Sequence, residues 1–269
     1  MIQNLRLNRL LWILVSLGAL VAAIIGVANP AIYDGVTSAK VLPGVFTQDI
    51  LVLVTAPIAL VLAVLAKERD FRKHVVTLGI VAFFIYAYGI YSIEQLYNYL
   101  YPLYLAILGA AVYTLIYGFS SLGAYAGQPV DVPAVTRYIC AAVAVLIAVM
   151  FNVIWMGRMI PLIQEANRIE FTHSVFVIDL SFIMPGFVIA AIMMLRRRRT
   201  GQVGIPVLFV LGVGILSPLA LVELVKPGRY SGEFIASEFW LFAILSVLFL
   251  VLTVLYLATL RMHHEPDSA

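Results

Sequence analysis

The chain has 269 residues, of which 63% are hydrophobic and only 12% are charged. Soluble domains are roughly 45 to 50% apolar, so this composition excludes a soluble globular protein. Together with a mean hydropathy of +1.04, it predicts an integral membrane protein. We attribute the net charge of +3 to membrane topology and not to nucleic-acid binding. The single cysteine, Cys140, excludes an intrachain disulfide and a dithiol redox pair.

Eight apolar segments are long enough to cross a bilayer, which requires roughly 20 apolar residues per helix. We therefore predict an all-α polytopic protein with eight transmembrane helices. The first segment is longer than the h-region of a signal peptide, about 7 to 15 residues, so we interpret it as a membrane helix. Pro57, Pro185 and Pro218 predict kinks in the second, sixth and seventh helices. The segments are 9–28, 48–66, 75–93, 100–119, 136–156, 173–195, 203–224 and 237–260.

The distribution of lysine and arginine predicts the orientation. With the N-terminus in the cytoplasm, twelve basic residues lie on the cytoplasmic side and five lie outside. The positive-inside rule then predicts a multi-pass protein of the cell membrane with both termini cytoplasmic. The cytoplasmic residues are Arg6, Arg9, Lys67, Arg69, Arg72, Lys73, Arg137, Arg196, Arg197, Arg198, Arg199 and Arg261, and the outer ones are Lys40, Arg158, Arg168, Lys226 and Arg229.

Matching acidic residues indicate that the chain is an internal duplication. Val45-Phe-Thr-Gln-Asp49 and Val175-Phe-Val-Ile-Asp179 place an aspartate in the same frame 130 residues apart, and Glu94 and Glu223 are 129 apart. Four spans in each half predict parallel repeats related by an axis along the membrane normal. We expect a first four-helix repeat over 1–119, a cytoplasmic linker over 120–135 and a second repeat over 136–269.

Carboxylates near the outer ends of these helices are the main site candidates. We interpret Asp49 as the N-cap of the second helix, where it would accept hydrogen bonds from backbone N–H groups. Asp179 lies about 9 Å along the helix from His173, within an apolar stretch. A carboxylate buried there requires a cation, a proton or hydrogen-bond donors. Asp179 is therefore the strongest candidate for a functional group.

Other side chains extend this candidate site. Glu94 and Glu223 end helices, and Lys226 or Arg229 is expected to neutralise Glu223. If the four acids converge, they form an outward-facing mouth suited to a hard cation, a protonated amine or a proton relay. Tyr88 and Tyr91 share a helix face beside Glu94, and Asn152 with Trp155 is a weaker candidate. The predicted binding residues are Asp179, Asp49, Glu94, Glu223, His173, Tyr88 and Tyr91.

The four-plus-four arrangement resembles that of haem A synthases. In that family, histidines within the helices bind haem. Here His74 and His173 lie at helix ends, and the paired loop cysteines of the family are absent. The resemblance is limited to topology and does not extend to haem binding, so we assign no cofactor.

Three functions remain open from the sequence. The first is transport of a small solute or a cation between the two bundles, which paired repeats and prolines favour. The alternative is a membrane-embedded enzyme or binding protein that acts on a lipid- or quinone-like molecule, with Asp179 as acid, base or orienting group. The third is a non-catalytic subunit that packs against another membrane protein. A polar cavity across the midplane favours transport, whereas one that closes below Asp179 favours the alternative.

Overall fold

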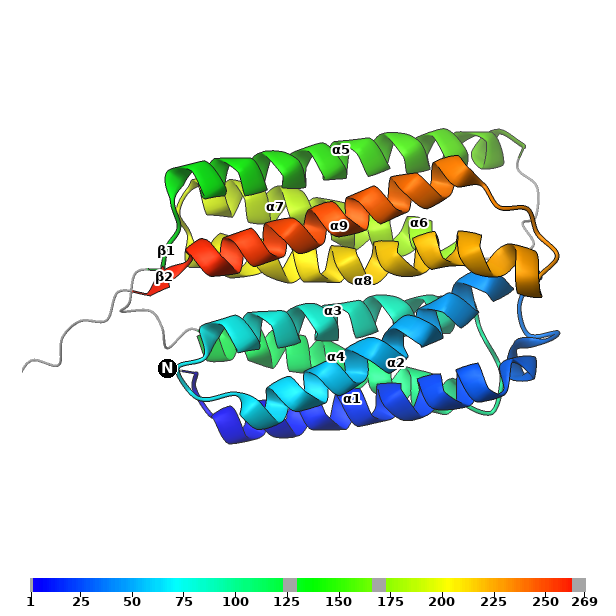
Figure 1. Cartoon of the computed structure of the whole chain (residues 1–269), viewed down its shortest axis with the longest axis horizontal. Helices are drawn as coiled ribbons and strands as arrows, with labels where there is room; N and C mark the ends of the chain where they lie inside the picture. The colour runs from blue at the N-terminus through cyan, green and yellow to red at the C-terminus, as the bar shows by residue number, and fades with distance from the viewer. Residues whose placement is uncertain (1, 123–129, 166–172, 263–269) are drawn as a thin grey trace, which may run out of the picture.

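The computed structural model describes residues 2–122, 130–165 and 173–262 (Figure 1). Within these ranges, eight helical spans are long and apolar enough to cross a membrane, as predicted. Part of the expected linker and Arg168 lie outside the described residues. The spans are α1 (Leu5–Ala28), α2 (Leu42–Leu65), α3 (Phe71–Ile93), α4 (Tyr101–Ser121), α5 (Ala134–Glu165), α6 to α7 (Ser174–Leu195), α8 (Arg199–Arg229) and α9 (Ala236–Thr259).

The helices pack in two groups, α1 to α4 and α5 to α9, which lie one above the other in Figure 1. The groups meet chiefly where α3 packs against α8 and where α2 contacts α8. Glycines allow close approach of α3 and α8, as is common between membrane helices. A Cβ added at Gly79 would lie 2.4 Å from the Cβ of Val210, and one at Gly214 would lie 2.6 Å from the ring of Phe83.

Both ends of the described chain lie at the same end of the molecule (Figure 1). There, the Ile2 amide donates to the Glu68 carbonyl at 2.9 Å, and Arg72 donates to the Leu260 carbonyl at 3.4 Å. The two-residue strands β1 (Val130–Asp131) and β2 (Arg261–Met262) pair antiparallel. This pairing joins the start of α5 to the end of α9. We call the end of the molecule where the described chain begins and ends the terminal end, and we call the opposite end the far end.

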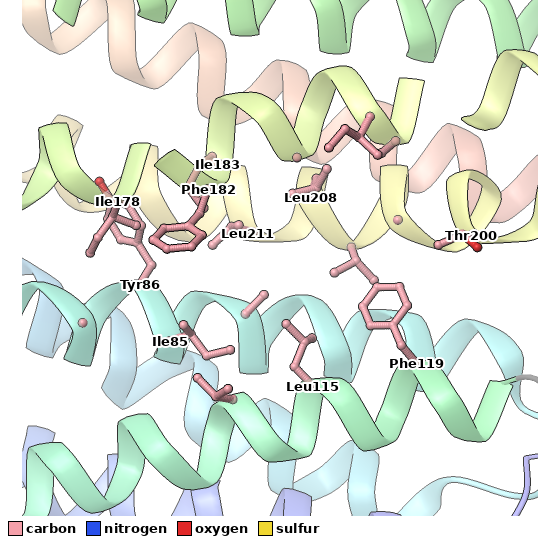
Figure 2. Close-up of a pocket in the computed structure, with 18 of the residues that line it drawn as sticks. Ile85, Tyr86, Leu115, Phe119, Ile178, Phe182, Ile183, Thr200, Leu208 and Leu211 are labelled. Atoms are coloured by element: carbon pink, nitrogen blue, oxygen red, sulfur yellow. The ribbon is translucent and has the colours of Figure 1, made fainter. Parts of the chain in front are cut away.

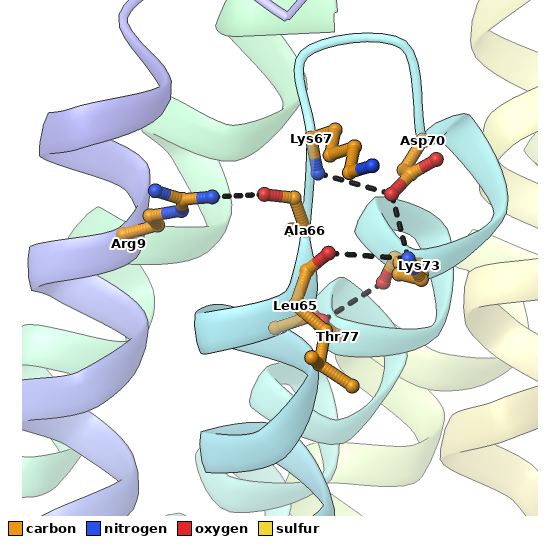
Figure 3. A network of polar contacts seen from close by, with 7 residues as sticks. All are labelled: Arg9, Leu65, Ala66, Lys67, Asp70, Lys73 and Thr77. Carbon is orange, nitrogen blue, oxygen red and sulfur yellow. Dashed lines mark hydrogen bonds and ion pairs between the residues drawn. The ribbon is translucent and has the colours of Figure 1, made fainter.

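Hydrogen bonds from basic side chains stabilise the loop between α2 and α3 at the terminal end (Figure 3). Arg9 donates to the Ala66 carbonyl, and Lys73 Nζ donates to the Leu65 carbonyl at 3.1 Å. These cations satisfy the last carbonyls of α2, where the helix dipole favours positive charge. Asp70 accepts from Lys73 Nζ at 2.7 Å and from the Lys67 amide at 3.0 Å. The hydrogen bond from Lys73 lowers the pKa of the Asp70 carboxyl below its usual value.

Helix α2 begins six residues earlier than the sequence predicts, at Leu42. Pro43 occupies its first turn, where a proline is favoured because its missing N–H has no helical partner. Asp49 therefore lies two turns inside the helix. The first turn of α2 spans residues 42 to 45, so Asp49 lies beyond the amides that an N-cap residue serves. The interpretation of Asp49 as an N-cap is therefore wrong.

The sixth span is interrupted where a kink is predicted. Helix α6 (Ser174–Ile178) leads into a π-helical turn, η3 (Asp179–Ile183), and then into α7 (Met184–Leu195). The Met184 amide donates to the carbonyl of Asp179, five residues back, just before Pro185. Single π turns of this kind are frequent at functional sites. Pro57 and Pro218 instead lie within the continuous helices α2 and α8.

Candidate functional site

A cavity of about 380 Å³ lies between the two helix groups at the far end. Side chains from α2, α3, α5, α6, η3, α8 and α9 line it, so neither group forms it alone. Its size is in the usual range for a small-molecule site, about 300 to 1,000 Å³. The charged side chains along it are of both signs: Asp179, Glu223, Glu238, Lys40, Arg158 and Lys226.

Asp179 is the buried carboxylate of this cavity, with only 4% of its surface exposed. Trp155 Nε1 donates to its Oδ2 at 2.8 Å. The Tyr86 hydroxyl lies beside the same carboxylate. The other oxygen, Oδ1, is buried and has no hydrogen-bond partner among the described residues. Buried polar atoms almost always have a partner, so Oδ1 requires a donor that the described residues do not supply.

Glu223 lies at the same cavity with its charge neutralised. Lys226 forms an ion pair with it, which confirms one of the two partners expected from the sequence. The Ile235 amide also donates to Glu223 Oε2 at 3.0 Å. Arg229, the other expected partner, lies over the ring of Phe46 at 4.3 Å. The carboxylate of Glu223 therefore holds the ends of α8 and α9 together.

Asp49 belongs to a closed network inside the first helix group, and Tyr91 links this network to the wall of the cavity. Tyr33 donates to its Oδ2 at 2.6 Å and Tyr91 donates to its Oδ1 at 2.7 Å. The hydroxyl groups of Tyr33 and Tyr104 are 3.4 Å apart. Asp49 is 1% exposed, and a Cβ added at Gly26 would lie only 2.0 Å from its Oδ2. Both carboxylate oxygens thus have protein donors, and the site has no space for a ligand.

The remaining candidates have structural contacts. Glu94 Oε1 accepts a hydrogen bond from the Ser174 amide at 2.6 Å, which ties the end of α3 to the start of α6. His173 precedes α6 with a φ of 50°, and its ring stacks on Phe176 at 5.0 Å. The Tyr88 hydroxyl donates to the Ala19 carbonyl at 3.0 Å. Of the seven predicted binding residues, the structure brings Asp179, Glu223 and Tyr91 together at the cavity.

Sequence reasoning missed two tyrosines that orient the carboxylates. Tyr33 ends the short 3₁₀ helix η1 (Pro30–Tyr33), where no periodic pattern marks it. Tyr86 belongs to a dense run of tyrosines in the sequence, and no pattern in that run indicates which tyrosine contacts Asp179 of the other helix group. Trp155 was a weaker candidate, and its position one turn from Phe151 on the same helix face was the available signal.

A larger, apolar groove of about 620 Å³ adjoins this cavity. It runs between α3 and α4 on one side and η3, α7 and α8 on the other (Figure 2). Figure 2 shows Tyr86 and Ile178 at one end of the groove and Phe119 and Thr200 at the other. Tyr86 lines both the groove and the cavity, so the two spaces meet at this side chain.

Comparison of the chain with protein-family models, with curated proteins and with solved structures finds no match. The topological resemblance to haem A synthases gains no support from these comparisons.

Proposed function

We propose that this protein binds the polar head of a lipid- or quinone-like molecule in the cavity between its two helix groups. The observation that carries the proposal is the buried Oδ1 of Asp179, which has no partner among the described residues. A buried acceptor without a donor costs about 1 to 3 kcal/mol, so a ligand that supplies a donor recovers that free energy. A hydroxyl group or an amine on the ligand meets this requirement, and a quinone-like molecule meets it in its reduced, quinol form, because a quinone carbonyl only accepts.

The positioning of Asp179 supports this role. Trp155 and Tyr86 hold the carboxylate, and Oδ1 is its oxygen without a partner among the described residues. The π turn that begins at Asp179 sets the direction of the side chain relative to α6 and α7. The same carboxylate is placed to accept a proton from the bound hydroxyl or amine, and an enzyme that acts on this molecule would use it as a general base.

Transport of a small solute or cation fits the lining of the cavity less well. From Lys226 to Ile215 on α8, the lining extends about 16 Å, or roughly half of a bilayer core. Its deepest residues on α8, Ile215 and Leu216, are apolar. A path for a hydrated ion requires polar groups along its length. A subunit that only packs against a partner would need no buried carboxylate at a cavity.

We also propose that the two helix groups are parallel repeats, with boundaries near 1–119, 120–135 and 136–269. The packing supports this, because each contact in the first group has a counterpart in the second. Contacts of α1 with α2, α3 with α4 and α1 with α4 correspond to those of α5 with α7, α8 with α9 and α5 with α9. The contact of α3 with α8 then lies on the axis of the pair.

We propose further that both termini are cytoplasmic and that the cavity opens to the outer side of the cell membrane. Twelve basic residues lie near the terminal end and four of the described ones lie at the far end, which supports this orientation. The far end is where the cavity lies, so its ligand head would lie near the outer surface.

Thermal unfolding tests the binding proposal directly. The full chain is purified and its Tm is measured with a sixteen-carbon primary alcohol and with the corresponding primary amine. We expect at least one of the two to raise the Tm of the wild type in a concentration-dependent way. In Asp179→Asn, Trp155 keeps the amide oxygen at the Oδ2 position and so places the amide N–H₂ where Oδ1 was. That exchange turns the acceptor into a donor. It is expected to abolish the shift with the amine, whose ammonium group cannot accept a hydrogen bond, and to reduce the shift with the alcohol, which loses a charged acceptor.

Asp49→Asn is the matched control, because it makes the same change at the closed network and should leave the ligand-induced shift intact. Two results contradict the proposal. One is that neither compound stabilises the wild type. The other is that Asp179→Asn responds as the wild type does.

A further inference from the structure

The apolar groove beside the cavity is hollow because small residues line it. A Cβ added at Gly186 of α7 has only Leu208 Cδ2 nearby, at 3.9 Å, and one at Gly204 of α8 would lie 3.4 Å from the Cβ of Ala190. All three small residues are part of the groove wall. Leucine or phenylalanine at these positions would fill the space that glycine leaves.

The groove also has the length and direction of a lipid chain. Its lining on α4 extends from Leu108 to Phe119, about 17 Å along the helix, and on α7 it extends from Ile183 to Met193, about 15 Å. These helices are membrane spans, so the groove follows the membrane normal. A chain in it would lie parallel to the surrounding lipid tails.

The groove borders the site of Asp179. Ile178 lines the groove, and the next residue, Asp179, lines the cavity. Tyr86 contributes to both walls, with its hydroxyl beside Asp179. Tyr86 is the side chain that the two spaces share, so a molecule that occupied both would have its head-to-chain junction there.

We propose that the ligand is a single-chain amphiphile whose long alkyl or isoprenoid chain lies in this groove. This inference rests on the proposed function, because it assigns the chain of the same molecule whose head binds Asp179. The closeness of the groove to Asp179 favours this ligand over bulk lipid, since a lipid that merely fills the groove has no need of the carboxylate. The chain provides the apolar contact, and Asp179 fixes the depth at which the molecule stops.

Photo-crosslinking in phosphatidylcholine nanodiscs tests the placement of the chain. The probe is a sixteen-carbon primary alcohol that carries a diazirine near the end of its chain, and crosslinked positions are mapped by mass spectrometry. We expect labelling to concentrate on groove residues such as Met193 and Phe119. Gly186→Leu and Gly204→Leu, which approach the groove from different helices, should each reduce this labelling at least five-fold.

Gly109→Leu is the matched control, because Gly109 is a mid-helix glycine of α4 with no atom within 4 Å of an added Cβ. It should label as the wild type does. Even labelling over the lipid-facing residues of every helix, unaffected by either groove variant, would overturn the inference and indicate bulk lipid only.

Asp179→Asn separates this inference from the proposed function. If both hold, Asp179→Asn reduces groove labelling as the leucine variants do. If Asp179→Asn has no effect while Gly186→Leu removes the labelling, the groove binds a chain but the proposed head site fails. If Asp179→Asn abolishes the thermal shift while the leucine variants leave it and the labelling unchanged, the head site holds and the groove assignment is wrong.

Discussion

Asp49 and Asp179 stand at corresponding positions of the two proposed repeats, but they have different surroundings. Asp49 has a tyrosine donor on each oxygen and lies against Gly26. Asp179 has Trp155 on one oxygen and no partner among the described residues on the other, and it lines a cavity. The contacts of Asp49 stabilise the first helix group, whereas Asp179 keeps one oxygen that can accept a hydrogen bond from a ligand. An acid in a membrane helix is thus informative only when the partners of each oxygen are known.

The interiors of the two helix groups also differ: the first is polar around its acid, and the second is apolar. Tyr33, Tyr91 and Tyr104 surround the buried acid of the first group. In the second group, Phe187, Phe209 and Phe249 pack with ring centroids 5.3 to 6.4 Å apart. The polar network stabilises the first group from within. The second group has an apolar centre, and its acid faces the boundary between the groups.

The largest effect on stability is expected from Asp49→Ala. This change leaves the buried hydroxyl groups of Tyr33 and Tyr91 without their acceptor, at a cost of roughly 2 to 4 kcal/mol. Asp179→Ala also removes the acceptor of Trp155 and Tyr86, but it should cost less, because it removes the unsatisfied Oδ1 and because the adjoining cavity can supply water to the two donors. Denaturant or thermal unfolding of both variants measures the difference. Equal losses would mean that the two acids do not differ as described.

Gly26→Ala should have the next largest effect, because the added Cβ displaces the Asp49 carboxylate and the Tyr33 hydroxyl. Overpacking of this kind typically costs about 1 to 3 kcal/mol. Gly157→Ala on α5 is the control, since a Cβ there meets no atom within 4 Å. A Gly26→Ala protein as stable as this control would show that the first network has more space than the structure indicates.

Trp155→Phe is expected to act on binding more than on stability. The ring contacts with Phe151 and Phe176 are largely kept, but the donor to Asp179 is lost. The carboxylate can then turn, and we expect the affinity for the long-chain alcohol to fall by about ten-fold, or 1.4 kcal/mol. Titration of the Tm shift against ligand concentration measures this change. An unchanged affinity would mean that Trp155 does not contribute to ligand binding.

The smallest effect is expected from Asp70→Asn in the loop between α2 and α3. Its exposed ion pair with Lys73 contributes at most about 1 kcal/mol. Since the pKa of Asp70 is lowered in the folded protein, this contribution is present above the unfolded pKa of about 3.9 and is lost as the pH falls through the lower folded pKa. The stability difference between wild type and variant should therefore vanish in acid. A difference that grows in acid would contradict this sign.

Hydropathy was sufficient to predict the eight spans, because the bilayer requires continuous apolar stretches. Helix ends were less predictable: α5 continues to Glu165 and α8 to Arg229, beyond their apolar windows. The contacts of the two acids could not be predicted from hydropathy, because hydropathy reports depth in the membrane but not the rotation of a helix about its axis. That rotation directs Asp49 into its own group and Asp179 toward the other. Pro185 did signal the distortion beside Asp179, although the form of that distortion, a π turn, had no signal.

Fluorescence quenching of Trp155 tests the central claim most directly. The background is a chain that carries Trp240→Phe, since Trp240 is 60% exposed. The ligand is a sixteen-carbon alcohol brominated beside its hydroxyl group, and a chain that also carries Trp155→Phe gives the signal to subtract. We predict saturable quenching that weakens at least ten-fold in affinity with Asp179→Asn and is unchanged with Asp49→Asn. Quenching that does not saturate, or that both variants affect equally, would contradict a ligand site at Asp179.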